Sequence, residues 1–229
     1  YALAAPRMAA DGIATLRIDF MGNGDSTASY RDYNYTSAVI DAKAAADYLA
    51  GLETVDGGNL GVMGWSQGGT DALLAAEAHP GTFQAVVTWS GALELNGASL
   101  FAGTSFEDAY AQAKKEGFYT MTFDWREPLE LGERWFQEVA ETNILKVTAD
   151  IKAPILAING KDDTTVTPDN AEKIVKAAAN ADSQLLLVDN CDHTYNVFSG
   201  DFTALYQTVD ATAAFFQAQL IPAAAQAAA

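Results

Sequence analysis

Apolar residues follow two patterns that alternate along the chain, one of strand length and one with helical spacing. Short apolar or β-branched runs predict strands at 13–20, 59–65, 83–90, 154–159 and 184–189. Apolar positions three or four residues apart predict helices at 2–10, 35–50, 67–78, 168–179 and 202–220. Because strands alternate with helices, the pattern predicts an α/β fold in which a mostly parallel sheet is flanked by helices.

The alternation is interrupted between residues 95 and 150, in a stretch that is rich in aromatic residues. We interpret 95–150 as an inserted helical cap, which divides the core into 1–94 and 151–221. The Ala-rich residues 222–229 are interpreted as a tail. The sequence therefore predicts one α/β domain with an insertion.

Composition excludes several classes of function. The 229 residues carry a formal net charge of −17, which argues against binding to a nucleic acid backbone. A single cysteine, Cys191, excludes an intrachain disulfide and is interpreted as a small buried thiol. No apolar run reaches the roughly 18 residues of a membrane helix, so we expect a soluble, cytoplasmic protein, with secretion left open. A homo-oligomer is compatible with the sequence.

The segment Gly64-Trp65-Ser66-Gln67-Gly68 fits the pattern G-x-S-x-G between a predicted strand and a predicted helix. A serine in such a tight turn projects its hydroxyl away from the sheet. The backbone amide of Gln67, at the start of the helix, is then placed to donate to an oxyanion. Although this pentapeptide also occurs at ordinary glycine-rich helix starts, the preceding strand favours Ser66 as a nucleophile.

A nucleophilic serine needs a base, and the chain has only two histidines. His79 stands at a predicted helix end before Pro80, where a surface role is the simpler interpretation. His193 follows the predicted strand 184–189, and catalytic groups gather at the carboxyl ends of such strands. We therefore predict His193 as the general base.

The acid that orients the base is expected after the preceding strand, where Asp162 and Asp163 both stand. Either carboxylate gives the chain order Ser, Asp, His, which is the order found in α/β-hydrolases. Neither the spacing nor the composition separates the two.

Four segments together resemble the α/β-hydrolase superfamily: Gly64–Gly69, Asp19–Ser26, Gly160–Val166 and Cys191–His193. The resemblance is closest to bacterial serine esterases of the cinnamoyl or feruloyl esterase kind, and it implies that Asp163 is the acid. It also implies that the cap forms the acyl-group pocket. The aromatic candidates for this pocket are Trp65, where relatives more often carry His, and Phe123, Trp125 and Trp135.

The resemblance also implies that this chain is N-terminally short. In the superfamily, a third strand lies between the strands that correspond here to 13–20 and 60–65, and the loop after it supplies a second oxyanion donor. The sequence contains neither, and it begins at Tyr1 rather than Met. We considered a truncated or cleaved form, strands supplied by another chain, and direct pairing of the two neighbouring strands.

The predicted function is hydrolysis of small-molecule carboxylic esters, with short or aromatic acyl groups, through an acyl-enzyme on Ser66. We expect no cofactor, no metal and no nucleic acid or membrane partner. Two alternatives remain at this point: an amide or acyl-peptide hydrolase, and a catalytically silent scaffold that acts by binding.

Overall fold

The computed structural model describes residues 3–97, 100–101, 103–123 and 127–221. The chain divides into two compact units. The first consists of residues 1–17, 43–93 and 144–229, and the second of residues 18–42 and 94–143. Each unit is described by itself below.

The first unit is built on a four-stranded parallel sheet with the strand order β1-β2-β5-β6. The strands are β1 (Leu60–Trp65), β2 (Phe83–Trp89), β5 (Ile155–Gly160) and β6 (Gln184–Val188). All four lie where the sequence predicted strands. Because the strands are parallel, their carboxyl ends meet at one edge of the sheet, which is the edge where the candidate residues were expected.

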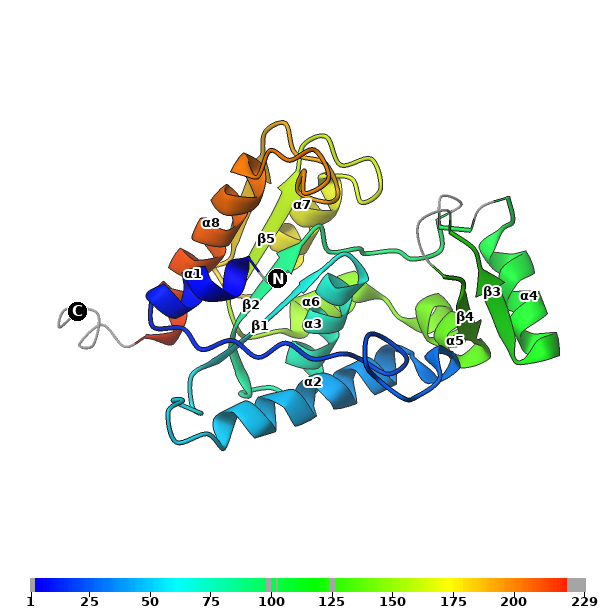
Figure 1. Ribbon diagram of the computed structural model, residues 1–229, viewed down its shortest axis with the longest axis horizontal. Helices are drawn as coiled ribbons and strands as arrows, with labels where there is room; N and C mark the ends of the chain where they lie inside the picture. The colour runs from blue at the N-terminus through cyan, green and yellow to red at the C-terminus, as the bar shows by residue number, and fades with distance from the viewer. Residues whose placement is uncertain (1–2, 98–99, 102, 124–126, 222–229) are drawn as a thin grey trace. The chain divides into compact units, whose positions relative to one another are not determined.

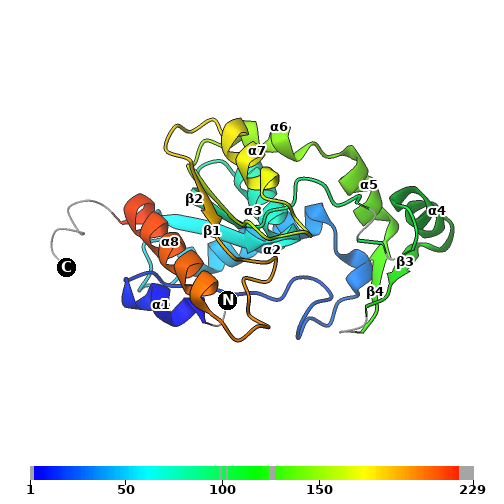
Figure 2. The same ribbon diagram turned by 90° about the horizontal axis from the view of Figure 1, so that it is seen from above.

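Helices cover both faces of this sheet (Figures 1 and 2). One face carries α3 (Gln67–Ala78), α6 (Ile144–Asp150) and α7 (Asp169–Ala177), and the other carries α1 (Ala4–Ala10) and α8 (Thr203–Leu220). The arrangement confirms the predicted α/β fold. Within the described part of the chain, no helix is both long and apolar enough to cross a membrane.

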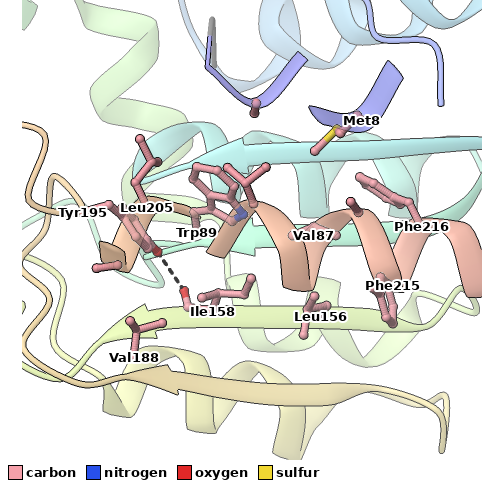
Figure 3. Close-up of a cluster of buried hydrophobic side chains, with 14 of the residues drawn as sticks. Met8, Val87, Trp89, Leu156, Ile158, Val188, Tyr195, Leu205, Phe215 and Phe216 are labelled. Atoms are coloured by element: carbon pink, nitrogen blue, oxygen red, sulfur yellow. Dashed lines mark hydrogen bonds between the residues drawn. The ribbon is translucent and has the colours of Figure 1, made fainter. Parts of the chain in front are cut away.

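The main hydrophobic core of the first unit lies between the sheet and α8 (Figure 3). Val87 and Trp89 from β2, and Leu156 and Ile158 from β5, alternate along their strands so that all four face α8. The indole Nε1–H of Trp89 donates to the hydroxyl oxygen of Thr212 on α8 at 2.9 Å. This buried hydrogen bond ties the sheet to the helix next to the carboxyl edge.

The predicted strand at 13–20 is wrong, because these residues form no ladder. A strand is stable only with a partner for its backbone hydrogen bonds, and β1 has β2 as its one partner among the described strands. Direct pairing of 13–20 with β1, considered above, is therefore not found among the described residues. The β-branched residues of the segment favour an extended backbone, but a strand also needs a neighbouring strand to pair with.

The second unit contains helices and an antiparallel hairpin. The sequence had predicted helices alone for this part of the chain. Its elements are the start of α2 (Tyr35–Ala50), the 3₁₀ helix η1 (Tyr30–Asp32), α4 (Phe106–Glu116), β3 (Phe118–Met121), β4 (Leu129–Gly132) and α5 (Glu133–Glu141). Gly117, at φ 87°, ends α4 in the left-handed region and leads directly into β3. The residues 118–121 and 129–132 are too few to give a clear strand period, which is why the hairpin was missed.

Six aromatic side chains form the interior of the second unit: Phe101, Phe106, Tyr110, Tyr119, Trp135 and Phe136. Their ring centroids lie between 5.0 and 6.5 Å apart in successive pairs. At the surface of this unit, Arg31 pairs with Glu130 at 2.8 Å and lies over the ring of Phe118. Most of the aromatic residues predicted for the cap therefore make up its own core.

Candidate active site

Ser66 lies in a strained turn between β1 and α3. Its backbone has φ 56° and ψ −123°, an uncommon conformation for a residue with a side chain, which typically costs about 1–3 kcal/mol. The Ser66 N–H donates to the carbonyl oxygen of Trp89 at 2.9 Å, which holds the turn against the end of β2. Ser66 precedes the first residue of α3, but its hydroxyl makes no capping bond. The hydroxyl is therefore available for other chemistry.

The two glycines of the pentapeptide have different roles. A Cβ atom on Gly64 would lie 1.9 Å from the carbonyl oxygen of Gly68, so no side chain fits there. A Cβ atom on Gly68 would meet nothing within 4 Å. Gly64 is thus required for the close approach of β1 to α3, while Gly68 supplies only its backbone to that contact.

Three side chains from the ends of three strands form one hydrogen-bonded chain. His193 Nδ1 lies 2.8 Å from Asp163 Oδ2, and His193 Nε2 lies 3.1 Å from Ser66 Oγ. The Asp163 side chain is fully buried and that of His193 is 16% exposed. The structure therefore brings together the three residues that the sequence singled out as nucleophile, base and acid, at distances that allow proton transfer between Ser66 and His193.

Asp163 is held by several donors besides His193. Its Oδ1 accepts hydrogen bonds from the N–H groups of Thr165 and Val166 at 2.9 and 2.8 Å. Burial by itself would raise the pKa of Asp163, but hydrogen bonds from His193, from Val166 and from the hydroxyl of Ser90 outweigh it and lower the pKa. The carboxylate therefore stays ionised through the neutral pH range, as an acceptor for His193 must.

The neighbouring carboxylate, Asp162, takes no part in this chain of contacts. Asp162 is exposed, and its backbone N–H donates to the carbonyl oxygen of Cys191 at 3.0 Å. Local geometry at the end of β5 thus turns Asp163 inward and Asp162 outward. The structure therefore distinguishes Asp163 from Asp162, which their spacing in the sequence could not do.

The loop that carries His193 is braced by residues that sequence reasoning missed. Tyr195 and Asn196 both have positive φ, at 56° and 59°, and Tyr195 is almost fully buried. The Tyr195 hydroxyl donates to the carbonyl oxygen of Ile158 at 3.3 Å (Figure 3) and lies 3.3 Å from the hydroxyl of Ser90. An aromatic residue two positions after His193 was visible in the sequence, but neither its burial nor its left-handed backbone could be read from the sequence.

Asn159 braces the acid in a similar way from inside β5. Its side chain is completely buried, and its Nδ2 donates to the carbonyl oxygen of Val166 at 2.9 Å and approaches Asp163 Oδ2 at 3.4 Å. A polar residue directly after the apolar run 155–158, inside the predicted strand, was the available signal. Asn159 therefore links the strand to the loop that carries Asp163.

Trp65 contacts His193 directly. Its indole Nε1–H donates to the backbone carbonyl oxygen of His193 at 2.8 Å. The indole and imidazole ring centroids lie 5.1 Å apart with an interplanar angle of 39°. Since Trp65 is also 39% exposed, it presents an apolar surface beside the imidazole of His193.

Gln67 is the first residue of α3, so its amide belongs to the first turn of the helix, as predicted. His79 is the C-cap residue at the other end of α3. Cys191 is buried, and this burial, together with Asp192, Asp163 and Asp162, raises the pKa of its thiol to about 12. Cys191 is thus not an activated nucleophile.

Among the described residues, no group of three or more His, Cys, Asp or Glu side chains is arranged to hold a metal ion. The remaining aromatic candidates belong to the second unit. Trp135 is 1% exposed in the aromatic interior of that unit, Phe123 is partly buried, and Trp125 lies outside the described residues.

The sequence of the chain matches the model of one known protein family. The model of the prolyl oligopeptidase family, Peptidase_S9, matches residues 3–221. The chain belongs to the prolyl oligopeptidase family. This family match includes both units and all three residues of the hydrogen-bonded chain.

Several solved structures share the fold of this member of the prolyl oligopeptidase family. Est1E from Butyrivibrio proteoclasticus, described with bound ferulic acid, matches with a TM-score of 0.77 and 21% identity over 96% of this chain and 83% of that one. A monoacylglycerol lipase from Paleococcus ferrophilus matches with a TM-score of 0.74 and 17% identity over 96% and 89%. A structure of DcsB with a substrate analogue matches with a TM-score of 0.78 and 15% identity over 95% and 85%. The expected α/β-hydrolase fold is confirmed.

Proposed function

We propose that this member of the prolyl oligopeptidase family is a serine hydrolase that cleaves carboxylic esters. The observation that carries the proposal is the chain of contacts from Asp163 through His193 to the hydroxyl of Ser66, at 2.8 and 3.1 Å. The strained backbone of Ser66 adds to it, because such strain persists mainly where function requires it. No cofactor enters the reaction.

Catalysis proceeds in two steps that use the same three side chains. His193 Nε2 accepts the proton of Ser66 as Oγ attacks the ester carbonyl, and Asp163 stabilises the imidazolium that forms. The proton then passes to the leaving alcohol, and an acyl-enzyme remains on Ser66. A water molecule, deprotonated by His193, releases the carboxylic acid and restores the serine.

The backbone N–H of Gln67 is the proposed donor to the oxyanion. It follows Ser66 at the start of α3, where the helix dipole also favours negative charge. One donor of this kind is typically worth about 10²–10³ in turnover.

The proposed substrates are esters with short or aromatic acyl groups. Trp65, which is partly exposed beside Ser66 and His193, offers an aromatic surface to the acyl group. Est1E, which has a similar fold and is described with bound ferulic acid, supports the proposal that the acyl group is aromatic. Phe123, Trp125 and Trp135 remain proposed pocket residues from the sequence.

Hydrolysis of an amide or acyl-peptide is a second candidate, which the family itself favours, since its name is that of a peptidase. The chemistry on Ser66 is the same, and the two candidates differ in the leaving group. Paired substrates with one acyl group, a 4-nitrophenyl ester and a 4-nitroanilide, distinguish them. We expect the ester to have the higher kcat/KM; a higher value for the anilide would favour the peptidase.

The test of the proposal is hydrolysis of 4-nitrophenyl esters from acetate to cinnamate, together with labelling by a fluorophosphonate. Labelling reports the activated serine independently of substrate preference, because the probe reacts with a hydroxyl whose proton a general base removes as it attacks. We expect turnover of at least one ester, and a single adduct that mass spectrometry assigns to Ser66. Folded protein that neither hydrolyses an ester nor acquires the adduct would instead be a silent scaffold.

Replacing the proposed acid, Asp163→Asn, is expected to lower kcat by about 10⁴ with the fold retained, because an amide no longer stabilises the imidazolium. The neighbouring Asp162→Asn variant removes the same charge at an exposed position and is expected to keep wild-type kcat. Steady-state kinetics of both variants on the preferred ester check this. Equal losses in the two variants would contradict the assignment of Asp163.

A further inference from the structure

Trp65 joins the two loops whose side chains must meet for catalysis. It is the last residue of β1, one position before Ser66, and its indole N–H donates to the main-chain carbonyl oxygen of His193 at 2.8 Å. These positions are 128 residues apart along the chain. A single side chain therefore connects the turn of the nucleophile to the loop of the base.

The other hydrogen bonds of the His193 loop described here involve other atoms, whereas the carbonyl oxygen of His193 accepts from Trp65. Asp192 Oδ1 accepts the N–H groups of Thr194 and Asn196 at 2.8 and 2.9 Å, so these bonds hold the loop to itself. Tyr195 anchors the loop to the end of β5 through Ile158. The hydrogen bonds of His193 itself run from its ring to Asp163 and Ser66 and from its carbonyl oxygen to Trp65.

The indole ring adds a second constraint on His193. It lies against the imidazole at 5.1 Å between centroids, tilted by 39°. Proton transfer requires Nε2 within about 2.6–3.2 Å of the serine hydroxyl, and the observed 3.1 Å lies near the upper end of that range. A small displacement of the imidazole would therefore be enough to break the contact.

We propose that Trp65 is a positioning residue, whose N–H fixes the main chain of His193 and whose ring restricts the imidazole so that Nε2 stays directed at Ser66. This inference rests on the proposed function and adds to it a role for Trp65 besides that of an acyl-pocket wall. The two roles make different kinetic predictions. Loss of positioning slows every substrate by the same factor, whereas loss of a pocket wall weakens binding of aromatic acyl groups alone.

The experiment compares Trp65→Phe, which keeps an aromatic ring but has no N–H, with Trp65→Leu, which has neither. Each variant is assayed with the 4-nitrophenyl esters of acetate and cinnamate, and the rate of fluorophosphonate labelling at Ser66 is measured in parallel. Phe198→Leu serves as the matched control, because Phe198 is an aromatic residue of the same loop that is 88% exposed. Thermal unfolding of all variants is recorded separately.

We expect Trp65→Phe to lower kcat about tenfold, the value of one lost hydrogen bond of about 1.4 kcal/mol, equally for both esters and with KM changed less than twofold. Labelling should slow by the same factor, and Trp65→Leu should lose about 10². Phe198→Leu should match the wild type.

Three results would overturn the proposal for Trp65 while leaving the function intact. They are unchanged acetate kinetics in both Trp65 variants, a rise in KM confined to cinnamate, and a lower unfolding temperature with unchanged kinetic constants. If the wild type labels without hydrolysing either ester, the labelling rates alone decide the role of Trp65. Wild-type protein that neither labels nor hydrolyses an ester overturns both proposals.

Discussion

Replacement of Ser66 by alanine is expected to lower kcat on the preferred 4-nitrophenyl ester by about 10⁶ and to abolish the fluorophosphonate adduct. Without Oγ no acyl-enzyme forms, and only direct attack of water in the site remains. Because the Ser66 side chain makes no capping bond to α3, its removal should not lower the free energy of unfolding. Steady-state kinetics and urea unfolding of the same preparation measure the two effects.

Ser105→Ala is the matched control, because Ser105 also precedes a helix but does cap it. The Ser105 hydroxyl accepts the N–H of Asp108 at 3.0 Å at the start of α4. Its loss should cost about 1 kcal/mol of stability and leave kcat unchanged, the reverse of the result for Ser66. Substantial residual turnover in Ser66→Ala, with an adduct elsewhere, would assign the nucleophile to another residue.

The parts of the fold that the sequence predicted well depend on local patterns. The helices α2 and α3 begin and end at the predicted residues, Tyr35–Ala50 and Gln67–Ala78. The turn at Ser66 was predicted because its two determinants, an apolar strand before it and an Ala/Leu helix after it, are adjacent in the sequence. The four strands of the sheet were found for the same reason, since each is a short apolar run.

The parts that the sequence did not predict depend on partners far along the chain. Residues 13–20 have the composition of a strand, but whether they form one is decided by a neighbouring strand, and β1 pairs only with β2 among the described strands. Likewise, Asp162 and Asp163 are equivalent by position, and the resemblance to esterases was needed to prefer Asp163. Their difference in direction comes from the backbone bonds of Val166 and Cys191.

The same limit applies to the surroundings of the candidate site. Trp65 was predicted as a pocket wall from the resemblance, because relatives more often carry His at this position, but its hydrogen bond to His193 joins positions 128 residues apart. Tyr195 is buried and has a backbone with positive φ, a conformation that side-chain type alone does not indicate. Sequence motifs therefore identify the reacting groups here, while the residues that align them become visible only in the folded chain.

Replacement of His193 by alanine is expected to lower kcat by about as much as replacement of Ser66, roughly 10⁶, because the three side chains act as a unit. The imidazole Nε2 lies 3.1 Å from Ser66 Oγ and is the proposed acceptor of its proton, so the substitution removes the general base. Labelling by the fluorophosphonate should slow in proportion, although Ser66 is still present. Single-turnover kinetics and timed labelling test this directly.

His79→Ala is the matched control, since His79 and His193 are the only histidines of the chain. His79 is the C-cap residue of α3, and its backbone N–H, which the substitution keeps, makes the hydrogen bond to Ala75. We expect His79→Ala to retain wild-type kcat, and the double variant to be no slower than His193→Ala. If Ser66→Ala and His193→Ala instead had additive effects, the two side chains would act independently, and the hydrogen-bonded chain would not be the catalytic unit.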